Sequence, residues 1–230
     1  MNNKKVRLIV CGAQGKMGVR ILALAAQDAR FEVVAGIERS DDMTSLLRDA
    51  DAVIDFTAPE ATLKIAQAAA KAKKALVIGT TGVSDATLAK LRALSRRIPI
   101  VFSPNMSVGM NVLFRLVAEA AKSLAHYDIE VVEAHHNLKK DAPSGSAIKL
   151  AQVAEDASKK KKIGISSVRA GDIVGDHTVL IAGPGERLEL THRAHSRDAF
   201  AAGSLTAAAW ALGRKPGLYS MKDVLNLGKK

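Results

Sequence analysis

The N-terminal part of the chain alternates between short apolar runs and longer stretches in which apolar positions recur with the helical period. The apolar runs predict buried strands over residues 6–11, 32–37, 52–56, 75–78 and 98–102. The stretches between them predict helices over residues 19–27 and 59–71 and from a cap at Ser84 to about Arg96. Apolar strands that alternate with helices are typical of a parallel sheet covered on both faces. The pattern therefore predicts an α/β fold with a Rossmann-like, doubly wound parallel sheet.

The pattern changes beyond Asn105, where we expect a hinge between two domains. It then predicts helices over residues 108–124, 144–157 and 198–212, and strands over residues 127–134, 165–170, 177–182 and 187–195. The last two strands flank Gly183-Pro184-Gly185, a turn signal that predicts an antiparallel hairpin. A short tail ends the chain. This part is predicted to be α+β, with an open mixed sheet that carries helices on one face.

Composition restricts the class of protein. With 48% hydrophobic residues, the 230-residue chain can bury a core in one domain or in two small ones. It contains no run of about 18 apolar residues that would span a membrane, and its N-terminus shows no signal-peptide pattern. The lone cysteine, Cys11, ends an apolar strand, which favours a buried, inert thiol in a reducing compartment. We therefore expect a cytoplasmic protein without a membrane partner.

The net charge of +11 raises the question of nucleic-acid binding. The positive charge is scattered, apart from the run Lys159–Lys162, which we expect to be a solvated loop. Aromatic residues make up only 3% of the chain and leave few surfaces for stacking on bases. No nucleic-acid partner is therefore expected. A basic field is equally suited to attracting a phosphate-bearing cofactor and a polyanionic substrate.

A glycine-rich loop, Gly12-Ala13-Gln14-Gly15-Lys16-Met17-Gly18, follows the first strand and opens a helix. Glycines at this place allow close approach to a pyrophosphate, which the helix N-terminus attracts. Glu38, at the end of the second strand, can accept hydrogen bonds from the adenosine ribose hydroxyls. Lys16 and Arg39 would instead favour a 2′-phosphate, so both NADH and NADPH are expected as cofactors. The alternative is a packing loop in an α/β domain that binds no nucleotide.

Small, polar or backbone-permissive residues follow the other predicted strands of this sheet. Ligands of such sheets lie beyond the carboxyl ends of the strands. Each position could also be a simple turn, but several coincide at one edge. The further cofactor-binding candidates are Phe56, Thr57, Gly79, Thr80, Thr81, Ser103, Pro104, Asn105 and Met106.

The stretch from Glu130 to Ala147 concentrates chemistry-bearing residues. His135 can exchange protons at neutral pH, and His136 and Lys139 add positive charge. Ser144-Gly145-Ser146 follows Pro143 and opens a helix, so its N–H groups and hydroxyls can bind a carboxylate. Lys140 is expected to face solvent, and Asp141 to orient a lysine or the turn. A zinc site is the alternative for the paired histidines, but no nearby cysteine or third histidine has the spacing of a zinc ligand, and no metal is expected.

At these residues the chain resembles the 4-hydroxy-tetrahydrodipicolinate reductase family, also called dihydrodipicolinate reductase. The resemblance is carried by residues 133–136, 139 and 141–147, and further by residues 12–18, 56–57, 59–60, 79–82 and 105–109. Two departures stand out. Ser146 stands where the family usually has threonine, which keeps the hydroxyl. The stretch between Glu38 and Asp51 is short for the family and removes a segment near the adenosine.

The resemblance implies an NAD(P)H-dependent reductase of a cyclic imine dicarboxylate in lysine (diaminopimelate) biosynthesis. His135 and Lys139 are then the acid pair that protonates the enamine formed by hydride transfer. The implied carboxylate clamp comprises His136, Lys139, Ser144, Gly145 and Ser146. By the same resemblance Arg197 helps with binding or with domain contact, and the family implies a homotetramer joined through the second-domain sheet.

The expected division is therefore a dinucleotide-binding domain over residues 1–106, completed by 198–230, and a substrate-binding and oligomerisation domain over residues 107–197. Two alternatives stay open. One is another two-domain NAD(P)-dependent enzyme, such as an amino-acid dehydrogenase. The other is a non-enzymatic protein that senses nucleotides or binds nucleic acid through its positive charge.

Overall fold

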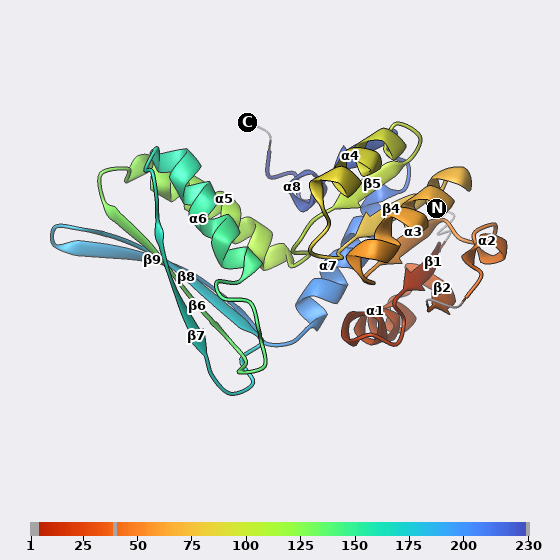
Figure 1. Cartoon of the computed structure of the whole chain (residues 1–230), viewed down its shortest axis with the longest axis horizontal. Helices are drawn as coiled ribbons and strands as arrows, with labels where there is room; N and C mark the ends of the chain where they lie inside the picture. Colours follow the sequence, from red (N-terminus) through yellow and green to blue (C-terminus); the bar gives the residue numbers. More distant parts are fainter. Residues whose placement is uncertain (1–4, 39–40, 229–230) are drawn as a thin grey trace. The chain divides into compact units, whose positions relative to one another are not determined.

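The computed structural model describes residues 5–38 and 41–228 (Figure 1). The chain divides into two compact units, Met1–Val108 with Phe200–Lys230 (unit 1) and Gly109–Ala199 (unit 2). Within the described residues, no helix is both long enough and apolar enough to cross a membrane.

Unit 1 is built on a six-stranded sheet in the order β10-β5-β4-β3-β1-β2, in which every neighbouring pair is parallel. Its strands are β1 (Val6–Cys11), β2 (Phe31–Ile37), β3 (Ala52–Asp55), β4 (Ala75–Ile78), β5 (Pro99–Phe102) and β10 (Gly217–Tyr219). The central strands are buried throughout because helices cover both of their faces. The predicted doubly wound α/β fold is confirmed.

The helices of unit 1 divide the apolar side chains of the sheet between two cores. One face is covered by α1 (Lys16–Gln27), α7 (Asp198–Ala211) and α8 (Met221–Val224), and the other by α2 (Met43–Leu46), α3 (Pro59–Lys71) and α4 (Asp85–Leu94). Because side chains alternate along a strand, Leu8 and Val10 of β1 enter the first core and Ile9 and Cys11 enter the second.

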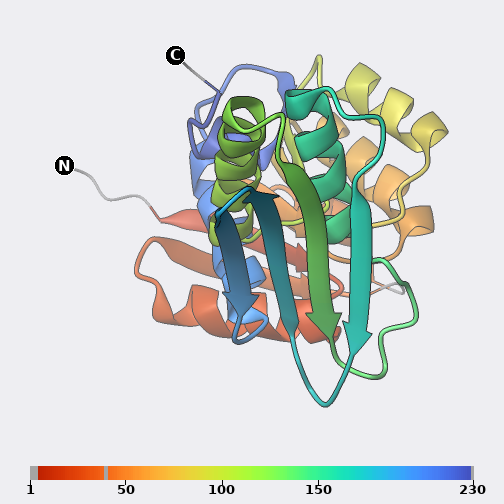
Figure 2. The same cartoon turned by 90° about the vertical axis from the view of Figure 1, so that its left-hand side faces the viewer.

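Unit 2 is a four-stranded mixed sheet in the order β7-β6-β8-β9. Its elements are α5 (Val108–Ser123), β6 (Asp128–His135), α6 (Gly145–Ser158), β7 (Gly164–Arg169), β8 (Gly175–Gly183) and β9 (Glu186–Ala194). β7 runs parallel to β6, whereas β8 and β9 form the predicted antiparallel hairpin. Both helices pack on one face of the sheet, as Figure 2 shows, and their apolar residues share a core with β6 and β8. The predicted open mixed sheet with helices on one face is confirmed.

The predicted boundaries are wrong at a few places. Helix α1 begins at Lys16 instead of Val19. The predicted start was too late because glycine is a poor helix former, yet Gly18 lies inside the helix. Strand β3 ends at Asp55 instead of Phe56. The predicted tail contains β10 and α8, and the short helix α2 was not expected. These elements are three or four residues long, too short to show a period.

Candidate active site

The helix-facing side of the sheet in unit 2 changes from apolar to polar along its two central strands. The buried positions are Ile129, Val131, Glu133 and His135 on β6, and Gly175, His177, Val179 and Ile181 on β8. Glu133 and His177 are paired in the register of the two strands. The exposed fraction is 0% for Glu133, 8% for His135 and 4% for His177. A group of titratable side chains is therefore enclosed where β6 ends.

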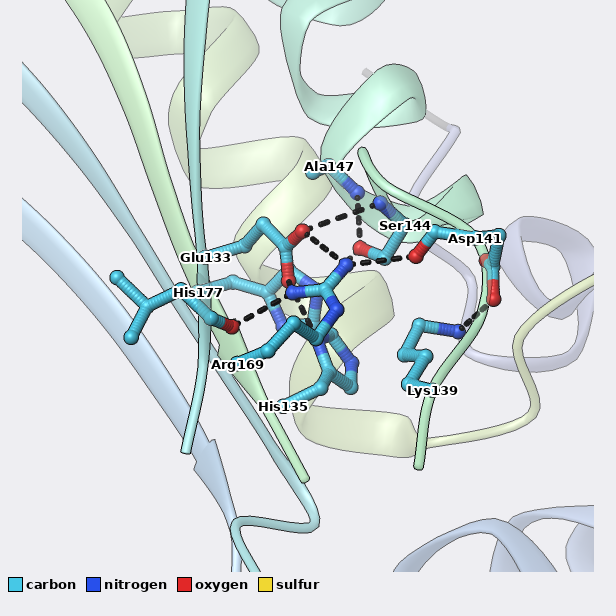
Figure 3. A network of polar contacts seen from close by, with 9 residues as sticks. Glu133, His135, Lys139, Asp141, Ser144, Ala147, Arg169 and His177 are labelled. Atoms are coloured by element: carbon cyan, nitrogen blue, oxygen red, sulfur yellow. Dashed lines mark hydrogen bonds and ion pairs between the residues drawn. The ribbon is translucent and has the colours of Figure 1, made fainter. Parts of the chain in front are cut away.

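The carboxylate of Glu133 is the centre of this group (Figure 3). Its Oε1 accepts hydrogen bonds from Nη2 of Arg169 at 2.8 Å and from the backbone N–H of Ser144 at 3.3 Å. Its Oε2 accepts from Nη1 of Arg169 at 3.0 Å and lies 2.5 Å from Nδ1 of His135. The side chain of Ser167 on β7 also hydrogen-bonds to this carboxylate, so the buried charge is fully paired.

The electrostatics of the group follow from burial and from these contacts. Burial alone would raise the pKa of Glu133, but hydrogen bonds led by that of Arg169 outweigh it and lower the pKa to about 2. Burial lowers the pKa of His135 in spite of the neighbouring carboxylate. At neutral pH, Glu133 is thus ionised and His135 is neutral. Because Nδ1 of His135 faces an acceptor, it carries the proton and leaves Nε2 as the basic nitrogen.

Ser144 is the N-cap of α6, and it links this helix to β8. Its Oγ accepts from the N–H of Ala147 at 3.2 Å and lies 3.1 Å from Nε2 of His177. Burial lowers the pKa of His177 to about 4, so this ring is neutral at neutral pH. Its edge meets the ring of His135, with the ring centroids 5.1 Å apart. The start of α6 is therefore held by side chains of β6 and β8.

The loop between β6 and α6 carries the predicted lysine. Nζ of Lys139 donates to Oδ1 of Asp141 at 2.8 Å, and Nη2 of Arg169 donates to the backbone carbonyl of Asp141 at 2.6 Å. Asp141 thus orients a lysine, and Lys140 is exposed, both as expected. Nδ1 of His136 is buried and has no hydrogen-bond partner among the described residues. An unpartnered polar atom of this kind suits contact with a ligand.

The remaining predicted clamp residues lie at the first turn of α6. Gly145 is exposed, and a methyl group added there would meet no atom within 4 Å. Ser146 is half-buried. The N–H groups of a helix start attract anions, so the cap and first turn of α6 can receive a carboxylate beside Lys139. In the part of the chain that the structure describes, no group of three His, Cys, Asp or Glu residues could hold a metal ion.

In unit 1 the predicted glycine loop joins β1 to α1. Gly12 has a φ of +80°, and the N–H groups of Gly12 and Ala13 both donate to the carbonyl of Ile37, at 2.8 and 3.3 Å. The N–H of Gln14 donates to Oε1 of Glu38 at 2.6 Å. The carboxylate of Glu38 therefore lies against the loop, at the end of β2 where the sequence predicts ribose recognition.

Helix α1 begins directly beside this turn. Gly15 is its N-cap and makes no side-chain hydrogen bond, and Lys16 and Met17 form the first turn. A Cβ at Gly18 would collide with the carbonyl oxygen of Gly12, so glycine is needed for the helix to lie this close to the loop. A helix start without a side-chain cap and a backbone without Cβ atoms fit a dinucleotide pyrophosphate.

Asp55, at the end of β3, organises the neighbouring turns. It is fully buried and accepts hydrogen bonds from the N–H and Oγ1 of Thr57 at 2.9 and 2.6 Å. It also accepts from Oγ1 of Thr62 at 2.8 Å and from Oγ1 of Thr80 at 3.1 Å. One carboxylate thus fixes the turns after β3 and β4, where Thr57 and Thr80 were predicted to meet the cofactor.

Most other cofactor candidates lie at the same edge of the sheet. The ring of Phe56 lies against Gly79, where any Cβ would collide with it. Oγ of Ser103 donates to the carbonyl of Asn105 at 2.8 Å and shapes the turn after β5. The side chain of Met106 packs in the core, with 1% of its surface exposed, so it can offer a ligand its backbone only.

The last candidates occupy exposed or intermediate positions. Thr81 and Pro104 are exposed in the turns after β4 and β5. Arg197 is half-buried between β9 and α7. Arg39 lies outside the described residues.

Four residues of these two sites were not assigned a role from the sequence: Asp55, Glu133, Arg169 and His177. The sequence pattern contained a signal for two of them. Glu133 and His177 are polar residues on the inward side of an alternating apolar strand, where a side chain must be paired. Arg169 lies 36 residues from Glu133 in the chain, and only the register of β6 and β7 brings it within reach.

Two family models match this chain. The model described as "Dihydrodipicolinate reductase, N-terminus" matches residues 6–106, and "Dihydrodipicolinate reductase, C-terminus" matches residues 109–225. The 4-hydroxy-tetrahydrodipicolinate reductase of Geotalea uraniireducens (strain Rf4) is 41% identical over 265 aligned positions, which cover 96% of this chain and 99% of the relative. The enzyme of that name from Aquifex aeolicus (strain VF5) is 43% identical, with coverage of 96% and 99%.

Solved structures show the same fold. The dipicolinate-bound dihydrodipicolinate reductase from Paenisporosarcina sp. TG-14 has a TM-score of 0.83 and 24% identity, covering 94% of this chain and 98% of that one. The DAP dehydrogenase of C. glutamicum, solved in complex with DAP, has a TM-score of 0.59 and 13% identity, covering 100% and 97%. At these identities both similarities concern the fold alone.

Proposed function

The chain belongs to the dihydrodipicolinate reductase family, and we propose that His135 and Lys139 carry the proton chemistry of its reaction. That reaction is the NAD(P)H-dependent reduction of 4-hydroxy-tetrahydrodipicolinate to tetrahydrodipicolinate in lysine biosynthesis. The observation that supports the assignment most directly is the carboxylate of Glu133, which contacts both His135 and the start of α6.

Conversion of the 4-hydroxy substrate to tetrahydrodipicolinate needs loss of the 4-hydroxyl as water, transfer of a hydride, and then a proton on the enamine. A bound nicotinamide supplies the hydride. On the protein side, Glu133 holds Nδ1 of His135, so a proton taken up by the ring resides on Nε2. Because burial lowers the pKa of His135, its imidazolium is a stronger acid than a solvated one and gives up this proton readily. The ammonium of Lys139, oriented by Asp141, is the second donor.

The substrate carboxylates are bound at the start of α6 in this proposal. The hydroxyls of Ser144 and Ser146 and the N–H groups at Gly145 and beyond supply hydrogen bonds. His136, whose Nδ1 has no partner in the described structure, and Lys139 add contacts from the loop. Unit 2 is therefore the substrate-binding domain and unit 1 the dinucleotide-binding domain.

The family and the Rossmann-like fold establish a nicotinamide cofactor. Whether the enzyme uses NADH, NADPH or both is part of the proposal. Glu38 favours a free 2′-hydroxyl, whereas Lys16 favours a 2′-phosphate, and we infer that both NADH and NADPH are used. In the proposal the enzyme is cytoplasmic and forms a homotetramer through the sheet of unit 2, whose second face carries no helix of unit 2 among the described residues.

Two adjacent lysines provide the test. Lys139→Ala should lower kcat by a factor of about 10² to 10⁴, because it removes a proton donor and a substrate contact. Lys140→Ala is the matched control, since Lys140 is exposed one position away, and it should leave kcat unchanged. Turnover is followed as consumption of NADH or NADPH with freshly generated substrate, and cofactor dissociation constants verify that unit 1 is intact. Normal kcat in Lys139→Ala would remove Lys139 from the mechanism.

A further inference from the structure

The Glu133–Arg169 ion pair lies at the meeting point of the parts of the site. Glu133 contacts His135 and the N–H of Ser144, and Arg169 reaches the carbonyl of Asp141 beside the Lys139 contact. The side chains of Glu133 and Arg169 are 0% and 18% exposed. The proton-handling histidine, the anion-binding helix start and the lysine loop are therefore all attached to one ion pair with a buried carboxylate (Figure 3).

We propose that Glu133 and Arg169 are positioning residues for the reaction, which fix the tautomer of His135 and the places of Ser144 and the lysine loop relative to it. The inference rests on the proposed role of His135 as a proton donor. Neither residue needs to touch the substrate, because each acts through a group that does.

The hydrogen-bond inventory requires a carboxylate at position 133. Glu133 accepts from two N–H groups of Arg169, the N–H of Ser144 and Nδ1–H of His135, and the hydroxyl of Ser167 bonds to it as well. A glutamine there has the same shape but two lone pairs and two protons. Its NH₂ group would face donors on whichever side it lay. On the His135 side it would donate to Nδ1 and move the ring proton to Nε2.

The charges around His135 act in opposite directions. Glu133 on its own strand raises the pKa of His135, whereas Arg169 on β7 and Lys139 in the loop lower it, and burial lowers it most. His177 on β8 meets the ring edge-on and is neutral at neutral pH. Removing Glu133 and removing Arg169 should therefore shift the titration of one imidazole in opposite directions. General damage to the site would not produce opposite shifts.

The test is an NMR titration of histidine-labelled protein, with the His135 signals assigned from a His135→Gln variant. In the wild-type protein the ¹⁵N shifts should show neutral His135 protonated on Nδ1. Glu133→Gln should lower the titration midpoint by about one unit and convert the ring at least partly to the Nε2–H tautomer. Arg169→Gln should raise the midpoint. Glu130→Gln, an exposed position on the same strand, is the control and should change neither.

Activity provides the second readout. Glu133→Gln should lower kcat/KM about a hundredfold with the pH profile shifted as the NMR midpoint is, while the dissociation constant for NADPH stays unchanged. Unchanged tautomer and midpoint in folded Glu133→Gln would overturn the inference. If Glu133→Gln does not fold, an unshifted midpoint in Arg169→Gln would overturn the inference. An Nε2–H tautomer of His135 in the wild-type protein would overturn it without any variant. Full activity of His135→Gln would instead refute the proposed function.

Discussion

The burial of His177 should make the stability of this protein depend on pH. The ring is 4% exposed, and burial lowers its pKa to about 4, whereas in the unfolded chain it returns to about 6.5. In the window between these values the unfolded state binds more protons than the folded state. The stability that neutral His177 contributes is therefore complete above about pH 6.5 and is lost as the pH falls toward 4.

The size of the effect follows from the two pKa values. A shift from about 6.5 to about 4 corresponds to about 3 kcal/mol of unfolding free energy once both states are protonated. Between about pH 7 and about pH 5, the part lost is about 2 kcal/mol. This is a large fraction of the stability of an ordinary domain.

The perturbation is His177→Gln, whose amide can replace Nε2 in the contact with Oγ of Ser144 but does not titrate. Urea unfolding, followed by circular dichroism at one protein concentration, gives the free energy of unfolding at the two pH values. The loss on acidification should be about 2 kcal/mol smaller in the variant than in the wild-type protein. The exposed His126 provides the control, and His126→Gln should lose as much as the wild type. Equal losses in all three proteins would show that folded His177 titrates normally and would refute the argument from burial.

Three further predictions concern unit 1. Glu38→Ala removes the acceptor of the Gln14 N–H and should weaken NADH binding about tenfold with a smaller effect on NADPH; calorimetric titration would contradict this if both affinities fell equally. Gly18→Ala should destabilise the protein by a few kcal/mol, roughly 2 to 4, because its methyl group would collide with the carbonyl of Gly12; an unchanged thermal midpoint would show that α1 can shift at no cost. Burial raises the pKa of the Cys11 thiol to about 12, so iodoacetamide at about pH 8 should modify it only in unfolded protein, and rapid labelling of the native protein would disprove its burial.

Most of the fold could be predicted from the sequence because its strands are apolar runs bounded by Gly, Pro and polar residues. The strand over residues 75–78 and the helix over residues 59–71 were predicted with the bounds that the structure shows. The start of α1 was placed too late because the close approach of Gly18 to Gly12 is a tertiary contact that helix propensity does not report. The edge strand β10 was not predicted because it has only three residues and forms a strand through its pairing with β5.

The candidate site likewise has a part that could be predicted from the sequence and a part that could not. His135, Lys139 and Ser144 lie within one short stretch, so the chain order alone brings them together. Arg169 and His177 come from strands that the sequence predicts but whose register it does not give. A slip of one residue in a strand turns each side chain to the other face of the sheet, so their contacts with Glu133 and Ser144 needed the structure.

The interrupted course of unit 1 has a consequence for synthesis on the ribosome. Unit 2 is continuous over Gly109–Ala199, whereas unit 1 needs Phe200–Lys230 to be completed. Helix α7 supplies Ala201, Leu205 and Ala208 to the core on one face of the first sheet, and β10 supplies an edge strand. While the chain emerges, unit 2 can fold as soon as its last strand is free, but one face of the earlier sheet stays uncovered until the segment from Phe200 onward has been synthesised. The first sheet therefore begins to form before unit 2 but is completed after it, and its apolar face is exposed to solvent during that interval.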